Sequence, residues 1–131
     1  MDFSPGFRVA YSTDRGQTWI HSSIGQSANQ FPMPIVYPNG DVMVTYYGSG
    51  VTDIRSTNGG VGWGGVQTIS SISDPNCPPD DGGSNCSTWR LNAIPAIGVD
   101  PRNGDAVVTW ADGRNGTATI YYSRSTDNGA T

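Results

Sequence analysis

The 131-residue chain contains neither glutamate nor lysine, and Leu91 is its single leucine. These residue types are among the strongest helix formers, so long helices are not expected. β-branched residues and turn formers stand in their place, with 10 Val, 9 Ile, 12 Thr, 18 Gly and 9 Pro. Short strands joined by tight turns are typical of such a composition. The sequence therefore predicts an all-β fold.

Positive charge is scarce as well. Lysine and arginine together number 7 against 11 acidic residues, and the formal net charge is −4. No basic cluster is present, so the sequence lacks the electrostatic footprint of a nucleic-acid-binding protein. No apolar run approaches the roughly 18 residues of a membrane-spanning helix. The first residues lack the basic region and apolar core of a signal peptide, so a secretion signal would have to lie upstream. We expect neither nucleic acid nor membrane as a partner.

The two cysteines, Cys77 and Cys86, lie close together in a stretch rich in Gly, Pro and Asp. The only histidine, His21, is far away in sequence, which disfavours a zinc site. We interpret the cysteines as a local disulfide, which implies an oxidising compartment. Two reduced thiols in a cytosolic loop are the alternative. The sequence indicates no cofactor apart from a calcium ion, which three acidic residues of this stretch could bind. Ordinary hairpin turns use the same residue types. The three residues are Asp74, Asp80 and Asp81.

An internal repeat is the main signal in the sequence. Three segments, 12–19, 56–63 and 125–131, share the pattern Ser-x-(Asp/Asn)-x-Gly, and the first two continue to a tryptophan. The third reaches Thr131, one position before the corresponding tryptophan. The shared residues are Ser12, Asp14, Gly16 and Trp19, then Ser56, Asn58, Gly60 and Trp63, then Ser125, Asp127 and Gly129.

A second repeat lies between these segments. Residues 34–46 and 97–110 each read as a strand, an Asn-Gly-Asp turn and another strand. Asn-Gly between β-rich runs predicts a tight hairpin in which both central residues take a positive φ. The first two Ser-x-(Asp/Asn) segments are 44 residues apart and the last two 69. The shorter spacing matches one four-stranded propeller blade of about 40–45 residues. The cysteine stretch and a longer turn at 112–116 account for the excess in the other.

This spacing divides the chain into parts of successive blades. We expect a half blade over 1–28, a full blade over 29–70, a cysteine-containing loop insertion over 71–89 and an incomplete blade over 90–131. The expected strands are 7–12, 18–24, 32–37, 41–47, 51–56, 63–69, 92–99, 105–111 and 118–124.

Each repeated segment is expected to form the turn of a hairpin. The Asp or Asn oxygen would accept backbone N–H bonds about two residues further along. The glycine would take a positive φ. The tryptophan would fold over the turn and become buried, so Trp19→Ala should cost about 3–5 kcal/mol.

The three segments resemble the Asp-box, or BNR repeat, of sialidases and related secreted propellers. The resemblance covers nearly the whole chain apart from the cysteine stretch. It implies antiparallel four-stranded propeller blades with Asp-box hairpins, and an extracellular or secreted protein. A propeller needs about four to eight blades, and this chain holds little more than two. The expected partners are therefore the missing blades of a longer chain, or copies of the chain in a domain-swapped or ring-forming homo-oligomer.

The resemblance also raises the question of catalysis. Family sialidases use an arginine triad, a tyrosine nucleophile paired with a glutamate, and an aspartate acid/base. This chain has no glutamate, and neither 7–10 nor 90–95 reproduces the family's Phe/Tyr-Arg-Ile-Pro element. We therefore assign no catalytic residue.

Three functions remain open: a non-catalytic module that binds glycan or protein or acts as a scaffold, a fragment of a sialidase-like exo-glycoside hydrolase whose catalytic residues lie elsewhere, and an excised folding unit. The candidate ligand surface comprises Tyr46, Arg55, Trp110 and Arg114. Asp53 and Asp112 are further candidates for the mouth of a propeller.

Overall fold

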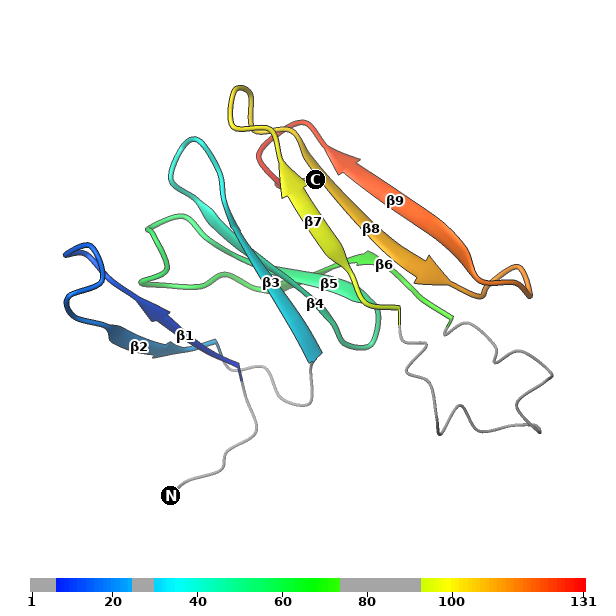
Figure 1. Ribbon diagram of the computed structural model, residues 1–131, viewed down its shortest axis with the longest axis horizontal. Helices are drawn as coiled ribbons and strands as arrows, with labels where there is room; N and C mark the ends of the chain where they lie inside the picture. Colours follow the sequence, from blue (N-terminus) through cyan, green and yellow to red (C-terminus); the bar gives the residue numbers. More distant parts are fainter. Residues whose placement is uncertain (1–6, 25–29, 74–92) are drawn as a thin grey trace, which may run out of the picture.

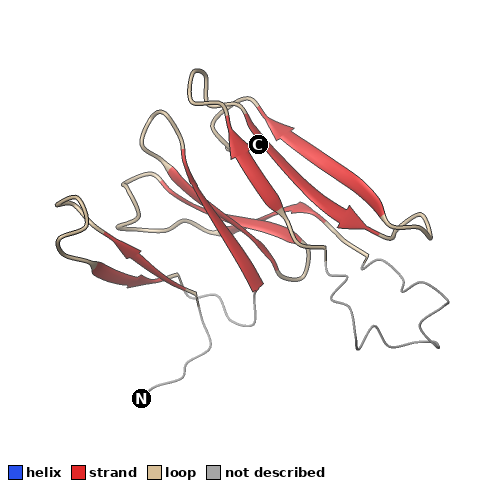
Figure 2. Cartoon of the chain, viewed as in Figure 1, coloured by secondary structure: helices blue, strands red, loops and turns tan. Residues whose placement is uncertain are grey.

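The structure, a computed structural model, describes residues 7–24, 30–73 and 93–131. Their regular secondary structure consists of nine strands in three antiparallel sheets, with no helix among the described residues (Figures 1 and 2). Accordingly, no helix that could cross a membrane occurs in this part of the chain. The prediction of an all-β protein is confirmed.

The strands follow the sequence order within each sheet. The first sheet contains β1 (Arg8–Tyr11) and β2 (Ile20–Ser23). The second contains β3 (Gln30–Val36), β4 (Val42–Tyr47), β5 (Val51–Ser56) and β6 (Val66–Ser70). The third contains β7 (Ala96–Val99), β8 (Ala106–Asp112) and β9 (Thr119–Ser125). The strands lie within a few residues of the predicted ranges. β6 starts later than predicted, after Gly64 and Gly65, which are poor strand formers.

The second and third sheets have the same strand register. Val44 of β4 pairs with Ile54 of β5, and Val108 of β8 pairs with Ser123 of β9. The pairing places β4 and β8 at equivalent positions, and likewise β5 and β9. Because β1 also precedes a Ser-x-(Asp/Asn) segment, it corresponds to β5, and β2 to β6.

The two Asn-Gly-Asp turns differ in detail from the prediction. Only their glycines, Gly40 (φ 88°) and Gly104 (φ 79°), have a positive φ. In the first turn the N–H of Tyr37 donates to the carbonyl of Asp41 (2.8 Å), and that of Gly40 to the carbonyl of Tyr37 (2.9 Å). This geometry encloses a three-residue loop that ends on a left-handed glycine, one of the common hairpin types. The expectation of a positive φ at both central residues was wrong.

The core is divided between the interfaces of neighbouring sheets, which lie side by side in Figure 1 with the second sheet in the middle. Val44, Tyr46 and Ile54 of the second sheet pack against the first sheet, with Phe7 and Val9 at their border. On the other side, residues of the second and third sheets form two further clusters. These contain Val51, Ala93, Val108 and Trp110, and Tyr37, Met43 and Ala106. Alternation along each strand therefore gives the second sheet two buried faces.

Candidate functional site

The first Ser-x-(Asp/Asn) segment forms a hydrogen-bonded turn between β1 and β2. Ser12 Oγ donates to Asp14 Oδ1 (2.8 Å) and accepts from the N–H of Gly16 (2.7 Å). Asp14 Oδ1 also accepts from the N–H of Thr18 (2.8 Å), and the Thr18 hydroxyl donates to Asp14 Oδ2 (2.6 Å). The indole Nε1 of Trp19 donates to the carbonyl of Gly16 (3.1 Å). The side chains of Ser12, Asp14 and Thr18 thus bond within the turn.

The second segment repeats this pattern between β5 and β6. Ser56 Oγ donates to Asn58 Oδ1 (2.9 Å) and accepts from the N–H of Gly60 (2.9 Å). Asn58 Oδ1 accepts from the N–H of Gly62 (2.7 Å). The indole of Trp63 donates to the carbonyl of Gly60 (3.1 Å).

The third segment, which follows β9, has the same bonds as far as it extends. Ser125 Oγ donates to Asp127 Oδ1 (2.7 Å) and accepts from the N–H of Gly129 (2.9 Å). Asp127 Oδ1 accepts from the N–H of Thr131 (3.0 Å). In every turn the Asp or Asn side chain accepts from the backbone N–H four residues further along, not from the one two residues along that was expected. The turn is therefore wider than a simple Asx-turn.

The backbone conformation of the three turns is equivalent as well. Each has two consecutive residues with a positive φ, and glycine always occupies the second of these positions. The pairs are Arg15 (61°) and Gly16 (86°), Gly59 (69°) and Gly60 (92°), and Asn128 (56°) and Gly129 (74°). A side chain opposes this region. The repeated glycine in the sequence predicts a positive φ at the second position. The first position holds Arg, Gly or Asn in the three turns, so the sequence pattern did not predict its positive φ.

The turn aspartates are stable carboxylates. Hydrogen bonds from Thr18 and Ser12 lower the pKa of Asp14 to about 2. Hydrogen bonds from Thr131 and Ser125 likewise lower the pKa of Asp127 below its usual range. Since hydrogen bonding to the charged form favours ionisation, these groups are poor proton donors near neutral pH. Asn58, which has no acid function, fills the same position. The turns are therefore suited to structure rather than to acid–base chemistry.

The two tryptophans of the turns lie in different surroundings. Trp63 packs against the cluster between the first and second sheets. Trp19 is 58% exposed, because no sheet among the described residues covers the outer face of β1 and β2. The expectation that Trp19 is buried was wrong, and this exposure lowers the cost expected for Trp19→Ala.

Each later turn packs closely on the preceding sheet. A Cβ added to Gly60 would lie 3.6 Å from the Cβ of Tyr11. One added to Gly129 would collide with the side chains of Tyr37 and Met43. Close approach therefore adds to the φ requirement at Gly129, whereas the contact at Gly60 is an ordinary van der Waals distance and only φ favours glycine there.

The aromatic members of the candidate ligand surface are core residues. Tyr46 is 1% exposed and packs edge-on against Phe7, with ring centroids 5.2 Å apart. Trp110 is also buried, and it stacks on Tyr121. Both point toward the preceding sheet. As placed here, neither offers a ring face for a sugar to stack on, which corrects the sequence-based assignment.

The arginine members of that surface, Arg55 and Arg114, form ion pairs. Arg55 of β5 forms an ion pair with Asp41 in the Asn-Gly-Asp turn, and Arg124 and Asp105 form the equivalent pair in the third sheet. Hydrogen bonding from Arg55 lowers the pKa of Asp41.

Arg114 connects two sheets. Its Nη2 donates to Oγ of Ser70, the last residue of β6 (3.1 Å), and to the carbonyl of the next residue, Ser71 (2.6 Å). The same guanidinium forms an ion pair with the buried carboxylate of Asp112. Its guanidinium lies 4.7 Å from the ring centroid of Tyr121. Hydrogen bonding from Arg114 lowers the pKa of Asp112 below its usual range. Arg55, Arg114 and Asp112 thus have structural partners.

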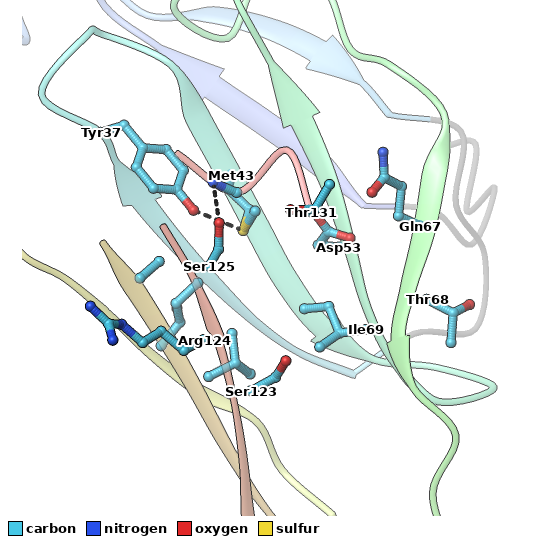
Figure 3. A pocket seen from close by; sticks show the side chains of 14 residues that line it. Tyr37, Met43, Asp53, Gln67, Thr68, Ile69, Ser123, Arg124, Ser125 and Thr131 are labelled. Atoms are coloured by element: carbon cyan, nitrogen blue, oxygen red, sulfur yellow. Dashed lines mark hydrogen bonds between the residues drawn. The ribbon is translucent and has the colours of Figure 1, made fainter. Parts of the chain in front are cut away.

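A cavity of about 240 Å³ lies between the second and third sheets (Figure 3). Side chains from β5 and β6, including Asp53 and Ile69, line one side, and Ser123 of β9 lines the other. Asp53 is 3% exposed, and its Oδ1 has no hydrogen-bond partner among the described residues. Burial raises the pKa of Asp53 to about 6. Burial similarly raises the pKa of the nearby Tyr37 to about 12.

The sequence predicts Asp53 only at the mouth of a propeller, whereas the structure places it between two sheets. The signal that could have revealed this was available. Asp53 stands three residues before Ser56, as Val9 stands before Ser12, so a charged residue replaces an apolar one on a core-facing position.

Several predictions fall on residues outside the described ranges. These are the disulfide between Cys77 and Cys86 and the calcium alternative at Asp74, Asp80 and Asp81. Among the residues that are described, no group of three or more metal-ligating side chains occurs.

Comparison with known proteins provides no assignment. No protein-family model matches the chain, and a search of curated proteins finds no relative.

Proposed function

We propose that the chain is a non-catalytic, sialidase-like Asp-box propeller module that binds glycan or protein or acts as an extracellular scaffold. The observation that supports this most is the recurrence of one turn three times, with the same acceptors and the same backbone, and in the second and third sheets with the same place after the third strand. The repeated Ser and Asp or Asn side chains bond within the turns, which suits a role in stabilising blades and leaves recognition to other surfaces. The motif resemblance supports the extracellular location.

The outer faces of the terminal sheets support a partner of the same architecture. Tyr122 and Ile120 of β9 correspond to Asp53 and Val51 of β5, which the third sheet covers. Yet Tyr122 is 73% exposed and Ile120 is 71% exposed. At the other end, Trp19 is the exposed counterpart of the packed Trp63. Large exposed apolar side chains on opposite faces suit head-to-tail stacking of a further sheet.

The partner is therefore either a further blade of a longer chain or a second copy of this one. Light scattering coupled to size exclusion tests the second source. We expect concentration-dependent oligomers that Tyr122→Arg weakens, whereas Val61→Arg, which changes another exposed apolar residue in the second turn, leaves them unchanged. A monomer at all micromolar concentrations would exclude the homo-oligomer.

Binding and catalysis are tested separately. A glycan array with the chain, and with the chain joined to neighbouring blades, tests recognition; the absence of binding in both would leave the scaffold role. The competing function is part of a sialidase-like exo-glycoside hydrolase. A fluorogenic sialoside assay addresses it, and hydrolysis by this chain alone would contradict a non-catalytic module.

A further inference from the structure

Asparagine precedes glycine at five places in the described part of the chain, each time in a turn. The dipeptides are Asn39-Gly40, Asn58-Gly59, Asn103-Gly104, Asn115-Gly116 and Asn128-Gly129. In such a pair the glycine nitrogen can attack the asparagine side chain, because glycine has no Cβ to obstruct the approach. The nitrogen gives up its proton in this reaction, so an N–H that already donates a hydrogen bond is protected. The hydrogen bonds of the five glycine nitrogens therefore indicate which pair reacts.

Four of these nitrogens donate hydrogen bonds. Those of Gly40, Gly104 and Gly116 donate to backbone carbonyl oxygens at 2.9, 2.9 and 2.8 Å. That of Gly129 donates to Ser125 Oγ (2.9 Å). Each of these bonds would have to break before the nitrogen could attack, and that loss adds to the barrier. We therefore expect these four pairs to be protected in the folded chain.

The nitrogen of Gly59 differs from the other four. None of the hydrogen bonds among the described residues uses its N–H. Asn58 and Gly59 are both exposed, and no atom lies within 4 Å of the position that a Cβ on Gly59 would take. The attacking nitrogen is thus free, and the backbone around it has room to move.

The side-chain carbonyl of Asn58 is polarised at the same time. Its Oδ1 accepts from Ser56 Oγ (2.9 Å) and from the N–H of Gly62 (2.7 Å). Negative charge develops on this oxygen when a nitrogen adds to the carbonyl carbon, and donors that are already in place stabilise such charge. Asn58 and Gly59 therefore combine a free nucleophile with an activated carbonyl.

We propose that the second turn is a site of self-modification, in which Asn58 converts to aspartate and isoaspartate. The nitrogen of Gly59 forms a bond to Cγ of Asn58, the Cγ–Nδ2 bond breaks, and ammonia leaves with the proton of the Gly59 N–H. Water then opens the cyclic imide. Addition at Cγ gives aspartate, the residue at this position of the other two turns, whereas addition at the main-chain carbonyl carbon gives isoaspartate, which lengthens the backbone. This inference does not depend on the proposed propeller function.

Peptide mapping by mass spectrometry during incubation at mildly alkaline pH tests the proposal. We expect Asn58 of the folded chain to convert at least about fivefold faster than each of the other four asparagines, the factor that one hydrogen bond represents. In concentrated urea, where the turns are lost, the five rates should become similar. Equal or faster conversion of any of the other four in the folded chain, or equal protection of all five, would overturn the proposal.

The variant Gly59→Arg identifies the attacking nitrogen. The equivalent position of the first turn holds Arg15 at a φ of 61°, close to the 69° of Gly59, so the turn accommodates this side chain. Because a side chain hinders ring closure, the conversion of Asn58 should slow severalfold. Val61→Arg adds the same charge at an exposed position of the same turn and should leave the rate unchanged. An unchanged rate in Gly59→Arg would mean that water attacks the amide directly, which contradicts the proposal.

Discussion

Asp14 and Asn58 accept the same hydrogen bond in two different turns. The oxygen Oδ1 of Asp14 lies 2.8 Å from the nitrogen of Thr18, and that of Asn58 lies 2.7 Å from the nitrogen of Gly62. Thr18 also carries a hydroxyl, which donates to the second carboxylate oxygen of Asp14, and Thr131 makes the same bond to Asp127 in the third turn, whereas Gly62 has no side chain to donate. An aspartate therefore occurs where the residue four positions later is a threonine, and an asparagine where that residue is a glycine.

The first prediction follows from this pairing. Asp14→Asn should destabilise the protein, because the amide nitrogen replaces the oxygen that accepts from Thr18. In a Thr18→Gly background the same substitution should be close to neutral. Chemical denaturation of the two single variants and the double variant measures the coupling. Additive effects would show that the two side chains do not act together.

The acidic limb of the pH–stability curve should reflect the turn carboxylates. The pKa of Asp14 is about 2 in the folded protein against an ordinary value of 3.8, so its stabilisation is complete above pH 4. It is lost as pH falls from about 4 to 2. Melting temperatures over this range should decrease less steeply for Asp14→Asn than for the unmodified chain. Parallel curves would contradict the assignment.

Asp53 should affect the pH dependence of stability in the direction opposite to Asp14. Its pKa is about 6 when folded and 3.8 ordinarily, so protonation favours the folded state. Stability should therefore increase as pH falls from about 7 to 4. Asp53→Asn should abolish this increase and, because it removes an unpaired buried charge, stabilise the protein at pH 7.5 by about 1–3 kcal/mol. Urea denaturation at both pH values is the measurement. A destabilised Asp53→Asn variant would show that the carboxylate has a partner in solution.

The two turn tryptophans should differ in their contribution to stability. Trp63→Ala removes a ring that packs between two sheets and should cost about 2–4 kcal/mol. Trp19→Ala removes an exposed ring and should cost less than about 1 kcal/mol. Each loses one equivalent hydrogen bond to a glycine carbonyl, so the pair is a matched comparison. Equal losses at low protein concentration would mean that Trp19 is covered in solution.

Arg114 should be the most sensitive arginine. Arg114→Ala leaves the fully buried Asp112 carboxylate without its ion-pair partner and removes the bonds to Ser70 and Ser71. We expect the melting temperature to fall by roughly 5 °C or more. Arg114→Lys should rescue little, since an ammonium lacks the planar fork. Arg102, whose side chain is 86% exposed in its pair with Asp100, is the control, and Arg102→Ala should have almost no effect.

The strands and turns could be predicted from the sequence because their causes are local. In each turn one side-chain oxygen bonds a backbone group four residues away, and glycine relieves a strained φ, so the motif folds alike wherever it recurs. Period-two alternation and turn residues likewise located the strands to within a few residues. Only details of turn geometry, such as the φ of the residues before Gly16 and Gly40, escaped the pattern.

The environment of each side chain was decided by the tertiary structure. Tyr46 and Tyr122 both lie on strands of alternating pattern, but a sheet covers the first and, among the described residues, none covers the second. Trp19 and Trp63 end identical motifs and differ for the same reason. The cavity at Asp53 arises because residues far apart in sequence leave a gap between two sheets. Burial depends on what lies across an interface, and a local pattern carries no information about that.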